Sequence, residues 1–297
     1  MGTFFKQIYR YTHPRAYRHN ENLWPHVKIT RSESGEITRL AYKKESVPLI
    51  PLSELKDAYS GEILLTATGP SVNEISFEIF PKMPAIGVNG AYFLNDRVEF
   101  SLYLIVDMGF IDQRPDIISD IIKNENLTFF TTVHGIARII DRFSIGSIKC
   151  RLVAIEDIAC KVYLPKIEDK NLYNEYVKNN DISFSENKTG FNTDIRNGVF
   201  DAGTVVYWAF QILSFLGFKL IYLVGLDMTN FHQPRFYETH EEKLPSFLHE
   251  KLDDIILPSF LHASQVMSRK KIKVINFSLN SAIDTDIFEK VSYRDVF

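Results

Sequence analysis

The sequence predicts an α/β fold in which helices cover both faces of a doubly wound, mostly parallel sheet. From residue 60 onward, apolar runs of strand length alternate with longer stretches whose apolar residues recur at helical spacing. The run 220–224 is apolar at every position, which is typical of a strand covered on both faces. Such alternation is the pattern of strand–helix–strand units around a parallel sheet.

The predicted strands are short apolar runs that end at turn-forming or polar residues. Asn89 follows the second run and Asp107 follows the third. Because parallel strands share one direction, their carboxyl ends meet at the same edge of the sheet. In chain order the predicted strands are 62–66, 85–88, 101–106, 127–132, 151–155, 219–224 and 273–277.

Capping residues and apolar spacing indicate the helices between these strands. Ser71 or Asn73 caps a short helix after the first strand. Gly217 ends a long apolar helix, because a left-handed C-cap favours Gly, and Pro258 suits a first helical turn. The remaining predicted helices are 89–95, 111–123, 134–143, 205–216, 240–256 and 258–269.

Composition divides the chain into an extension and one large domain. Residues 1–58 form a basic and aromatic N-terminal extension, and its first 50 residues hold nine Lys/Arg against four acidic residues. Such a segment either rests on an anionic membrane surface or packs on the domain as a solvated extension. The main domain is 59–297. Within it, 156–200 is polar and irregular and is predicted to be a lid or an acceptor-binding insertion.

Charge and cysteine usage exclude several classes of protein. A net charge of −3 and a pI near 6.3 argue against a nucleic-acid partner. Cys150 and Cys160 form no Cys-x-x-Cys pair, which indicates inert thiols and a cytoplasmic location. No apolar run reaches the roughly 18–20 residues of a membrane span. Any membrane contact is therefore expected to be peripheral.

Polar residues at four strand ends outline a crevice. The loop Gly69-Pro70-Ser71 follows the first strand and offers backbone N–H groups to an anion. Asn89 and Asp107 follow the next two strands, and Gly225-Leu226-Asp227 follows the strand 219–224. Taken singly, each residue is an ordinary loop cap; together they predict a ligand site. The loop lacks Gly-x-Gly-x-x-Gly and the Lys of a P-loop, which disfavours dinucleotides and ATP.

Several sequence blocks resemble known families of sugar transferases. Leu-Leu-Thr-Ala-Thr-Gly-Pro-Ser, Ala-Ile-Gly-Val-Asn-Gly, Asp-Ala-Gly-Thr-Val-Val and Val-Gly-Leu-Asp-Met resemble bacterial sialyltransferases that use a cytidine monophosphate (CMP) sugar. The lipopolysaccharide-core family that transfers 3-deoxy-D-manno-oct-2-ulosonic acid (Kdo) is a closer match. It resembles 84–94, 222–245 and 272–283, including Arg-Phe-Tyr-Glu and Asn-Phe-Ser-Leu-Asn-Ser-Ala-Ile.

The resemblance implies a single Rossmann-like glycosyltransferase domain that moves Kdo from CMP-Kdo to a hydroxyl of a lipid-linked glycan. It implies no cofactor and no metal, and no Asp-x-Asp pair directly follows any of the four strands that outline the crevice. A lipid-linked acceptor would lie at the inner face of the bacterial inner membrane. By resemblance, the donor-binding residues are Gly69, Pro70, Ser71, Asn89, Gly203, Thr204, Gly225 and Asp227, of which Gly203-Thr204 would hold cytidine.

Five residues are candidates for the chemistry. Arg235 and Tyr237 suit the donor phosphate or the sugar carboxylate, because Arg offers a bidentate fork and a phenol can donate a hydrogen bond. His262 is the expected general base, with His249 as its rival and Asp107 as a further choice. Two other functions stay open: transfer of sialic acid or another ketosugar from its CMP donor, and a non-catalytic relative.

Overall fold

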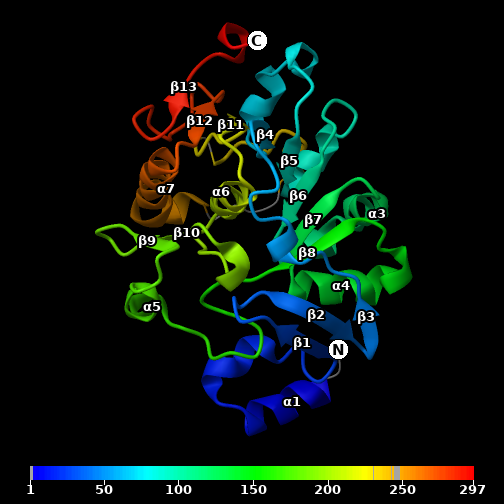
Figure 1. Cartoon of the computed structure of the whole chain (residues 1–297). Helices are drawn as coiled ribbons and strands as arrows, with labels where there is room; N and C mark the ends of the chain where they lie inside the picture. Colours follow the sequence, from blue (N-terminus) through cyan, green and yellow to red (C-terminus); the bar gives the residue numbers. More distant parts are fainter. Residues whose placement is uncertain (1–2, 230, 242, 244–247) are drawn as a thin grey trace.

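The computed structural model describes residues 3–229, 231–241, 243 and 248–297, and its centre is a parallel sheet (Figure 1). The strand order is β13-β12-β11-β4-β5-β6-β7-β8, and every neighbouring pair is parallel. The predicted doubly wound α/β fold is confirmed, and each predicted strand is correct to within one residue at either end. The strands are β4 (Glu62–Thr66), β5 (Ala85–Val88), β6 (Leu102–Ile105), β7 (Thr128–Thr132), β8 (Arg151–Ile155), β11 (Leu220–Val224), β12 (Lys273–Asn276) and β13 (Glu289–Lys290).

The order of the strands defines where a ligand is expected to bind. The chain runs outward from β4 through β5, β6 and β7 to β8, and then returns to β11 on the other side of β4. The direction of winding therefore reverses between β4 and β11. In open α/β sheets, ligands bind outside the carboxyl ends of the strands at such a reversal.

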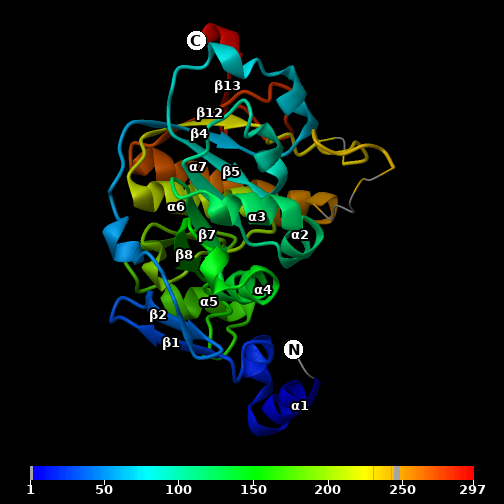
Figure 2. The ribbon, with the colours of Figure 1, turned by 90° about the vertical axis from the view of Figure 1, so that its right-hand side faces the viewer.

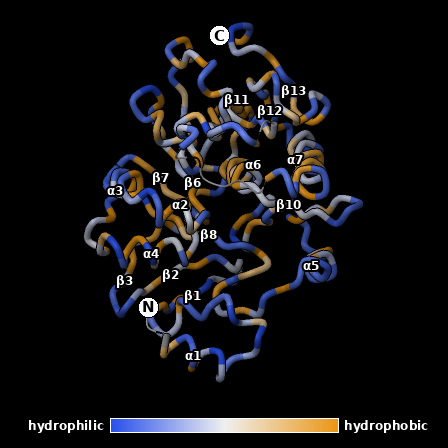
Figure 3. Tube along the Cα trace, turned by 180° about the vertical axis from the view of Figure 1, so that it is seen from behind, coloured by the Kyte–Doolittle hydropathy of each residue, from blue (hydrophilic) through white to orange (hydrophobic). Residues whose placement is uncertain are grey.

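Helices pack on both faces of the sheet and divide the hydrophobic core in two. Ile63 and Leu65 of β4 belong to the core under α6 (Val205–Leu216) and α7 (Leu257–Arg269), whereas Leu64 belongs to the core on the opposite face. That second core is covered by α2 (Met108–Gln113), α3 (Pro115–Lys123) and α4 (Val133–Phe143). Hydrophobic segments, orange in Figure 3, accordingly concentrate on the central strands and on α6.

The short helices predicted after the first two strands are 3₁₀ helices, Pro70–Glu74 and Asn89–Leu94, and two longer predicted helices also differ from the structure. The helix predicted over 111–123 is split into α2 and α3, because Pro115 lacks an N–H and forces Arg114 out of the helical region, to φ −121° and ψ 60°. The helix predicted over 240–256 is instead a 3₁₀ turn, Leu248–Lys251, and a π-helical turn, Leu252–Ile256, that leads into α7. Residues 242 and 244–247 lie outside the described part.

The N-terminal region folds and packs on the outer end of the sheet. It contains α1 (Thr3–Thr12) and an antiparallel meander of β1 (Val27–Arg31), β2 (Ile37–Tyr42) and β3 (Glu45–Val47). Arg31 forms an ion pair with Glu156, just past β8, and the Tyr42 hydroxyl donates to Asp141 of α4 at 2.8 Å. The inner side of this region is therefore part of the folded body.

The segment 156–200 is more ordered than its sequence predicts. It contains α5 (Asp169–Tyr176) and a small antiparallel pair, β9 (Ile182–Phe184) and β10 (Gly190–Asn192). These elements are too short to show a clear periodicity in the sequence. In the described part of the chain, no helix has the length and apolar character that crossing a bilayer requires.

Candidate active site

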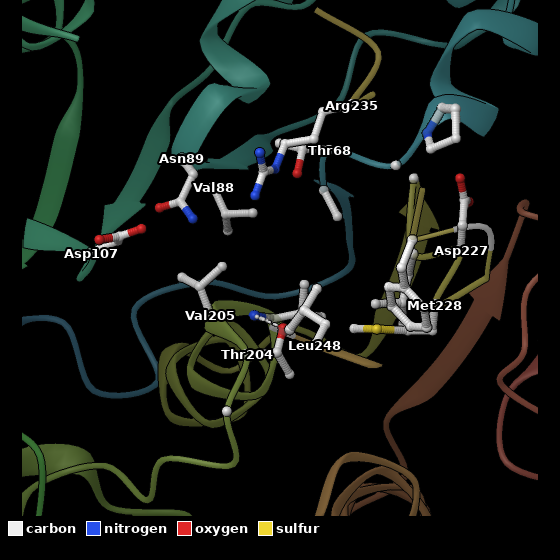
Figure 4. Close-up of a pocket in the computed structure, with 18 of the residues that line it drawn as sticks. Thr68, Val88, Asn89, Asp107, Thr204, Val205, Asp227, Met228, Arg235 and Leu248 are labelled. Atoms are coloured by element: carbon white, nitrogen blue, oxygen red, sulfur yellow. Dashed lines mark hydrogen bonds between the residues drawn. The ribbon is translucent and has the colours of Figure 1, made fainter. Parts of the chain in front are cut away.

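A pocket of about 610 Å³ opens at the carboxyl ends of β4, β5, β6 and β11, at the reversal of strand order (Figure 4). Asn89 and Asp107 lie at one end of the close-up, and Asp227 and Met228 lie at the other. Thr204 and Val205, at the start of α6, form the wall opposite Thr68 and Arg235. The predicted crevice thus exists, and the predicted residues that line it are Gly69, Pro70, Asn89, Asp107, Gly203, Thr204, Gly225, Asp227 and Arg235.

Asp227 holds the loop after β4 in place. One carboxylate oxygen accepts the Ser71 backbone N–H at 2.9 Å, and the other accepts the Ser71 hydroxyl. Asp227 is only 7% exposed, so these bonds are largely shielded from water. Ser71 was predicted to cap a helix, but the N-cap of the 3₁₀ helix Pro70–Glu74 is Gly69, and the Ser71 side chain bonds to Asp227. Its contact with the donor stays a prediction. The bonds between these two residues therefore fix the shape of the loop.

A second serine, which the sequence analysis missed, completes this network. The Ser278 hydroxyl lies 2.8 Å from the Ser71 hydroxyl and accepts the Gly225 N–H at 3.1 Å. Ser278 belongs to the Asn-Phe-Ser-Leu block after β12, so the resemblance could have singled it out. The loop after β4, the end of β11 and the end of β12 are thereby joined.

Two glycines at this junction have no room for a side chain. A Cβ on Gly69 would lie 2.4 Å from an Asp227 carboxylate oxygen and 2.7 Å from the Gly225 carbonyl oxygen. Gly225 has φ +76°, and a Cβ there would lie 2.6 Å from Val72. The close approach of the two chain segments therefore requires Gly at both positions.

Asn89 and Asp107 form the polar end of the pocket. Asn89 has φ +46°, and its buried side-chain oxygen has no hydrogen-bond partner within the described part of the protein. A buried oxygen without a partner can accept a hydrogen bond from a ligand hydroxyl. Asp107 is exposed, and its carboxylate accepts the Gly109 N–H at 2.8 Å as the N-cap of α2.

The start of α6 brings backbone N–H groups and a lysine to the pocket. Thr204 caps α6 by accepting the Val206 N–H at 3.4 Å, and Gly203 has φ +75°. The aliphatic part of Lys251 packs against Gly203, because a Cβ there would lie 3.0 Å from Cδ. Lys251 lines the pocket, and its ammonium has no hydrogen bond or ion pair within the described residues. The sequence analysis missed this cation.

Arg235 lines the pocket and is held by a buried acid. Its guanidinium lies 2.6 Å from the Glu238 carboxylate, and Glu238 is 8% exposed. The Arg235 backbone N–H also donates to Glu238, at 3.0 Å. Lys243, another lining cation, donates to the Phe231 carbonyl at 2.9 Å. Arg235 and Lys243 thus bring two cations to the pocket lining, together with the Glu238 carboxylate.

Tyr237 does not line the pocket. Its ring stacks on Phe93, with centroids 4.7 Å apart and an interplanar angle of 12°, and it lies against Gly90, where a Cβ would be 2.0 Å away. The Arg114 guanidinium lies 6.0 Å from the ring centroid. Burial raises the pKa of the Tyr237 phenol to about 12. In this position Tyr237 anchors the segment that carries Arg235. Its role at the donor phosphate stays a prediction.

His262 and His249 occupy different environments. His262 is 2% exposed, its Nε2 lies 3.1 Å from the Ser183 carbonyl oxygen, and burial lowers its pKa. It lies in α7 and is absent from the pocket lining. His249 is exposed in the turn whose first and last residues, Leu248 and Lys251, both line the pocket. His249 itself is also absent from the lining, but its turn borders the pocket, whereas His262 is buried in α7.

Potential metal ligands do not gather at the pocket in the described residues. No group of three or more His, Cys, Asp or Glu side chains within that part could hold an ion. One Asp-x-Asp sequence does occur, at Asp284 and Asp286, beyond the last long strand. Both carboxylates are exposed and lie outside the pocket lining, and the Asp284 carboxylate accepts the Asp286 N–H at 3.2 Å.

The chain is similar to several known proteins. A probable 3-deoxy-manno-octulosonic acid transferase of Escherichia coli K12 is 24% identical over 258 residues, which cover 82% of this chain and 86% of that protein. A protein of the same description from Salmonella typhimurium LT2 is 26% identical over 242 residues, covering 79% of this chain and 88% of that protein. A crystal structure of the sialyltransferase CST-II with trisaccharide acceptor and CMP has a TM-score of 0.39 and 14% identity, covering 76% of this chain and 84% of that one.

The family comparison covers most of the chain. The model of the 3-deoxy-D-manno-octulosonic acid transferase WaaZ family matches residues 51–294. This range contains the whole parallel sheet, the loop after β4, and the Arg235, Lys251 and Ser278 positions that shape the pocket. The match begins after the α1 and β1–β3 region. The chain belongs to the 3-deoxy-D-manno-octulosonic acid transferase WaaZ family.

Proposed function

We propose that this protein transfers Kdo from CMP-Kdo to a hydroxyl group of a lipid-linked, lipopolysaccharide-core glycan. The observation that carries the proposal is the membership of the family together with a pocket at the reversal of strand order. Such a donor brings two anions, a phosphate and a sugar carboxylate. The pocket offers Arg235, Lys243 and Lys251 to them, together with the first N–H groups of α6.

In this proposal the loop after β4 and Asn89 face the ribose and phosphate of the donor. The free oxygen of Asn89 accepts from a ribose hydroxyl, and the backbone of Gly69 and Pro70 approaches the nucleotide without side chains in the way. Asp227 fixes the shape of this loop by accepting hydrogen bonds from Ser71. Gly203 and Thr204 hold the cytosine at the start of α6.

For the base we propose His249, the rival of His262 in the sequence analysis. The acceptor hydroxyl loses a proton as the glycosidic bond forms, and an imidazole at the pocket rim can take it. Leu248 and Lys251 place the turn of His249 at the pocket, and the His249 ring centroid lies 6.0 Å from that of Phe231, which also lines it. Asp107 is the second candidate, because its own side chain lines the pocket.

A transfer assay separates the proposed function from its alternatives. Purified protein is incubated with CMP-Kdo or CMP-sialic acid and a set of truncated lipopolysaccharide acceptors. We expect product only with CMP-Kdo. Product with CMP-sialic acid would identify another CMP-ketosugar transferase. Absence of transfer with every donor, together with unimpaired CMP binding, would identify a non-catalytic relative.

CMP should bind without a divalent metal. Arg235, Lys243 and Lys251 line the pocket, and in this proposal these cations balance the phosphate charge in place of a metal. Calorimetry with CMP in excess chelator should give the same dissociation constant as calorimetry with added Mg²⁺. A strict need for Mg²⁺ would contradict the proposal, and Asp284→Asn would then show whether the Asp-x-Asp sequence supplies it.

Lys251→Met should weaken donor binding by about tenfold to a hundredfold, because a hydrogen bond to a charged group contributes about 1.5–3 kcal/mol. Met keeps the aliphatic packing on Gly203 and removes only the charge. The measurement is the dissociation constant of CMP and of the CMP-sugar. Lys270→Met, an exposed cation at the end of α7, is the matched control. Equal donor affinities in the two variants would contradict a role of Lys251 in donor binding.

A further inference from the structure

Helix α1 presents two aromatic side chains to solvent. Its inner side is fixed by Tyr9, which is 1% exposed, and by Phe5, whose ring centroid lies 6.0 Å from that of Trp24. On the outer side, Phe4 is 66% exposed and Tyr11 is 91% exposed. These two residues are seven positions apart, so they project from the same side of the helix. Nothing in the described part of the chain covers this side.

Four cations occur in and just after α1, against one acid. Within residues 4–21 the cations are Lys6, Arg10, Arg15 and Arg18, and the only acidic residue is Glu21. Arg10 donates to both oxygens of Glu21, at 2.6 and 2.7 Å. These hydrogen bonds lower the pKa of the Glu21 carboxyl, and the nearby charges of Lys6 and Arg18 lower it further. Arg15 and Arg18 are both exposed in the 3₁₀ helix that follows α1.

The position of α1 leaves it accessible from outside. In Figure 2, α1 lies at the lower end of the molecule, below β1 and β2. A flat surface could therefore approach α1 from this end.

We propose that Phe4, Lys6, Arg10, Tyr11, Arg15 and Arg18 form a docking surface for an anionic lipid bilayer. Charge complementarity identifies this occupant: exposed aromatic rings suit the headgroup region, and clustered Lys/Arg suit a negatively charged leaflet. The helix is ten residues long, so it lies on the surface and does not span it. The family match starts at residue 51, so the family comparison does not cover this surface.

The test is co-sedimentation of the full-length protein with vesicles. One set of vesicles contains phosphatidylglycerol in phosphatidylethanolamine, and the other contains only neutral phosphatidylcholine. We expect binding to the anionic vesicles alone, and the bound fraction should fall as salt is raised. Arg15→Gln with Arg18→Gln should lower the partition coefficient by about fivefold for each charge removed. Phe4→Ser with Tyr11→Ser should also lower it, at unchanged charge.

A matched control removes two exposed cations elsewhere. Arg269→Gln with Lys270→Gln, at the end of α7, removes the same charge and should bind vesicles like the unmodified protein. All variants should keep their transfer rate on a soluble acceptor, so this test does not depend on the proposed reaction. Equal binding to neutral vesicles, or equal losses in the control, would overturn the proposal. Capture by a soluble protein in place of vesicles would overturn it as well.

Discussion

His249→Ala should lower the rate of transfer by about 10²–10⁴-fold, because a positioned general base contributes an acceleration of that size. The affinity for CMP should change little, since the imidazole is proposed to meet the acceptor hydroxyl and not the nucleotide. Turnover is measured with saturating donor, and CMP affinity is measured by calorimetry. The two readouts separate loss of the base from distortion of the pocket.

His262→Gln is the comparison that decides between the two histidines. Gln can still donate a hydrogen bond to the Ser183 carbonyl, which the His262 ring contacts at 3.1 Å. We expect a lower melting temperature, because a buried side chain in α7 is changed, and near-normal turnover. A reversed pair of results would restore His262 as the base. If both variants keep normal turnover, Asp107→Asn should be the variant that lowers it.

The sequence predicted the sheet well because buried parallel strands leave a strong local pattern. Strand β11, with its continuous apolar run, and α6, which ends at Gly217, needed no tertiary information. The position of the pocket was also predictable, since polar residues at the carboxyl ends of parallel strands must share one edge. Asn89, Asp107 and Asp227 do share it.

The roles of individual site residues depend on contacts between distant segments, which a local pattern does not contain. Ser71 precedes its partner Asp227 by 156 residues and precedes Ser278 by 207 residues. The position of His262 followed from a helix start, but the direction of α7 places its ring beside Ser183. Tyr237 follows Arg235 by two residues and yet turns to Phe93, because Gly90 leaves space for its ring.

Asp227→Asn should weaken CMP binding by about tenfold to a hundredfold and also lower the melting temperature. The amide oxygen can still accept the Ser71 N–H, but the NH₂ group then meets the Ser71 hydroxyl, so that hydroxyl loses its charged acceptor and must turn away. A hydrogen bond to a charged group contributes about 1.5–3 kcal/mol, and this one sets the shape of the loop after β4. Asp284→Asn, which changes an exposed carboxylate outside the pocket, should leave CMP affinity unchanged.

A double-mutant cycle distinguishes positioning of the loop from direct contact with the donor. If Asp227 acts through Ser71, then Ser71→Ala and Asp227→Asn together should weaken CMP binding little more than Asp227→Asn alone, because both remove the same interaction. If Asp227 instead touches the nucleotide, the two losses should add. Gly69→Ala should resemble the double variant, since its Cβ would lie 2.4 Å from the same carboxylate and would force the loop away from it. Additive losses would contradict the positioning role and make Asp227 a direct ligand of the donor.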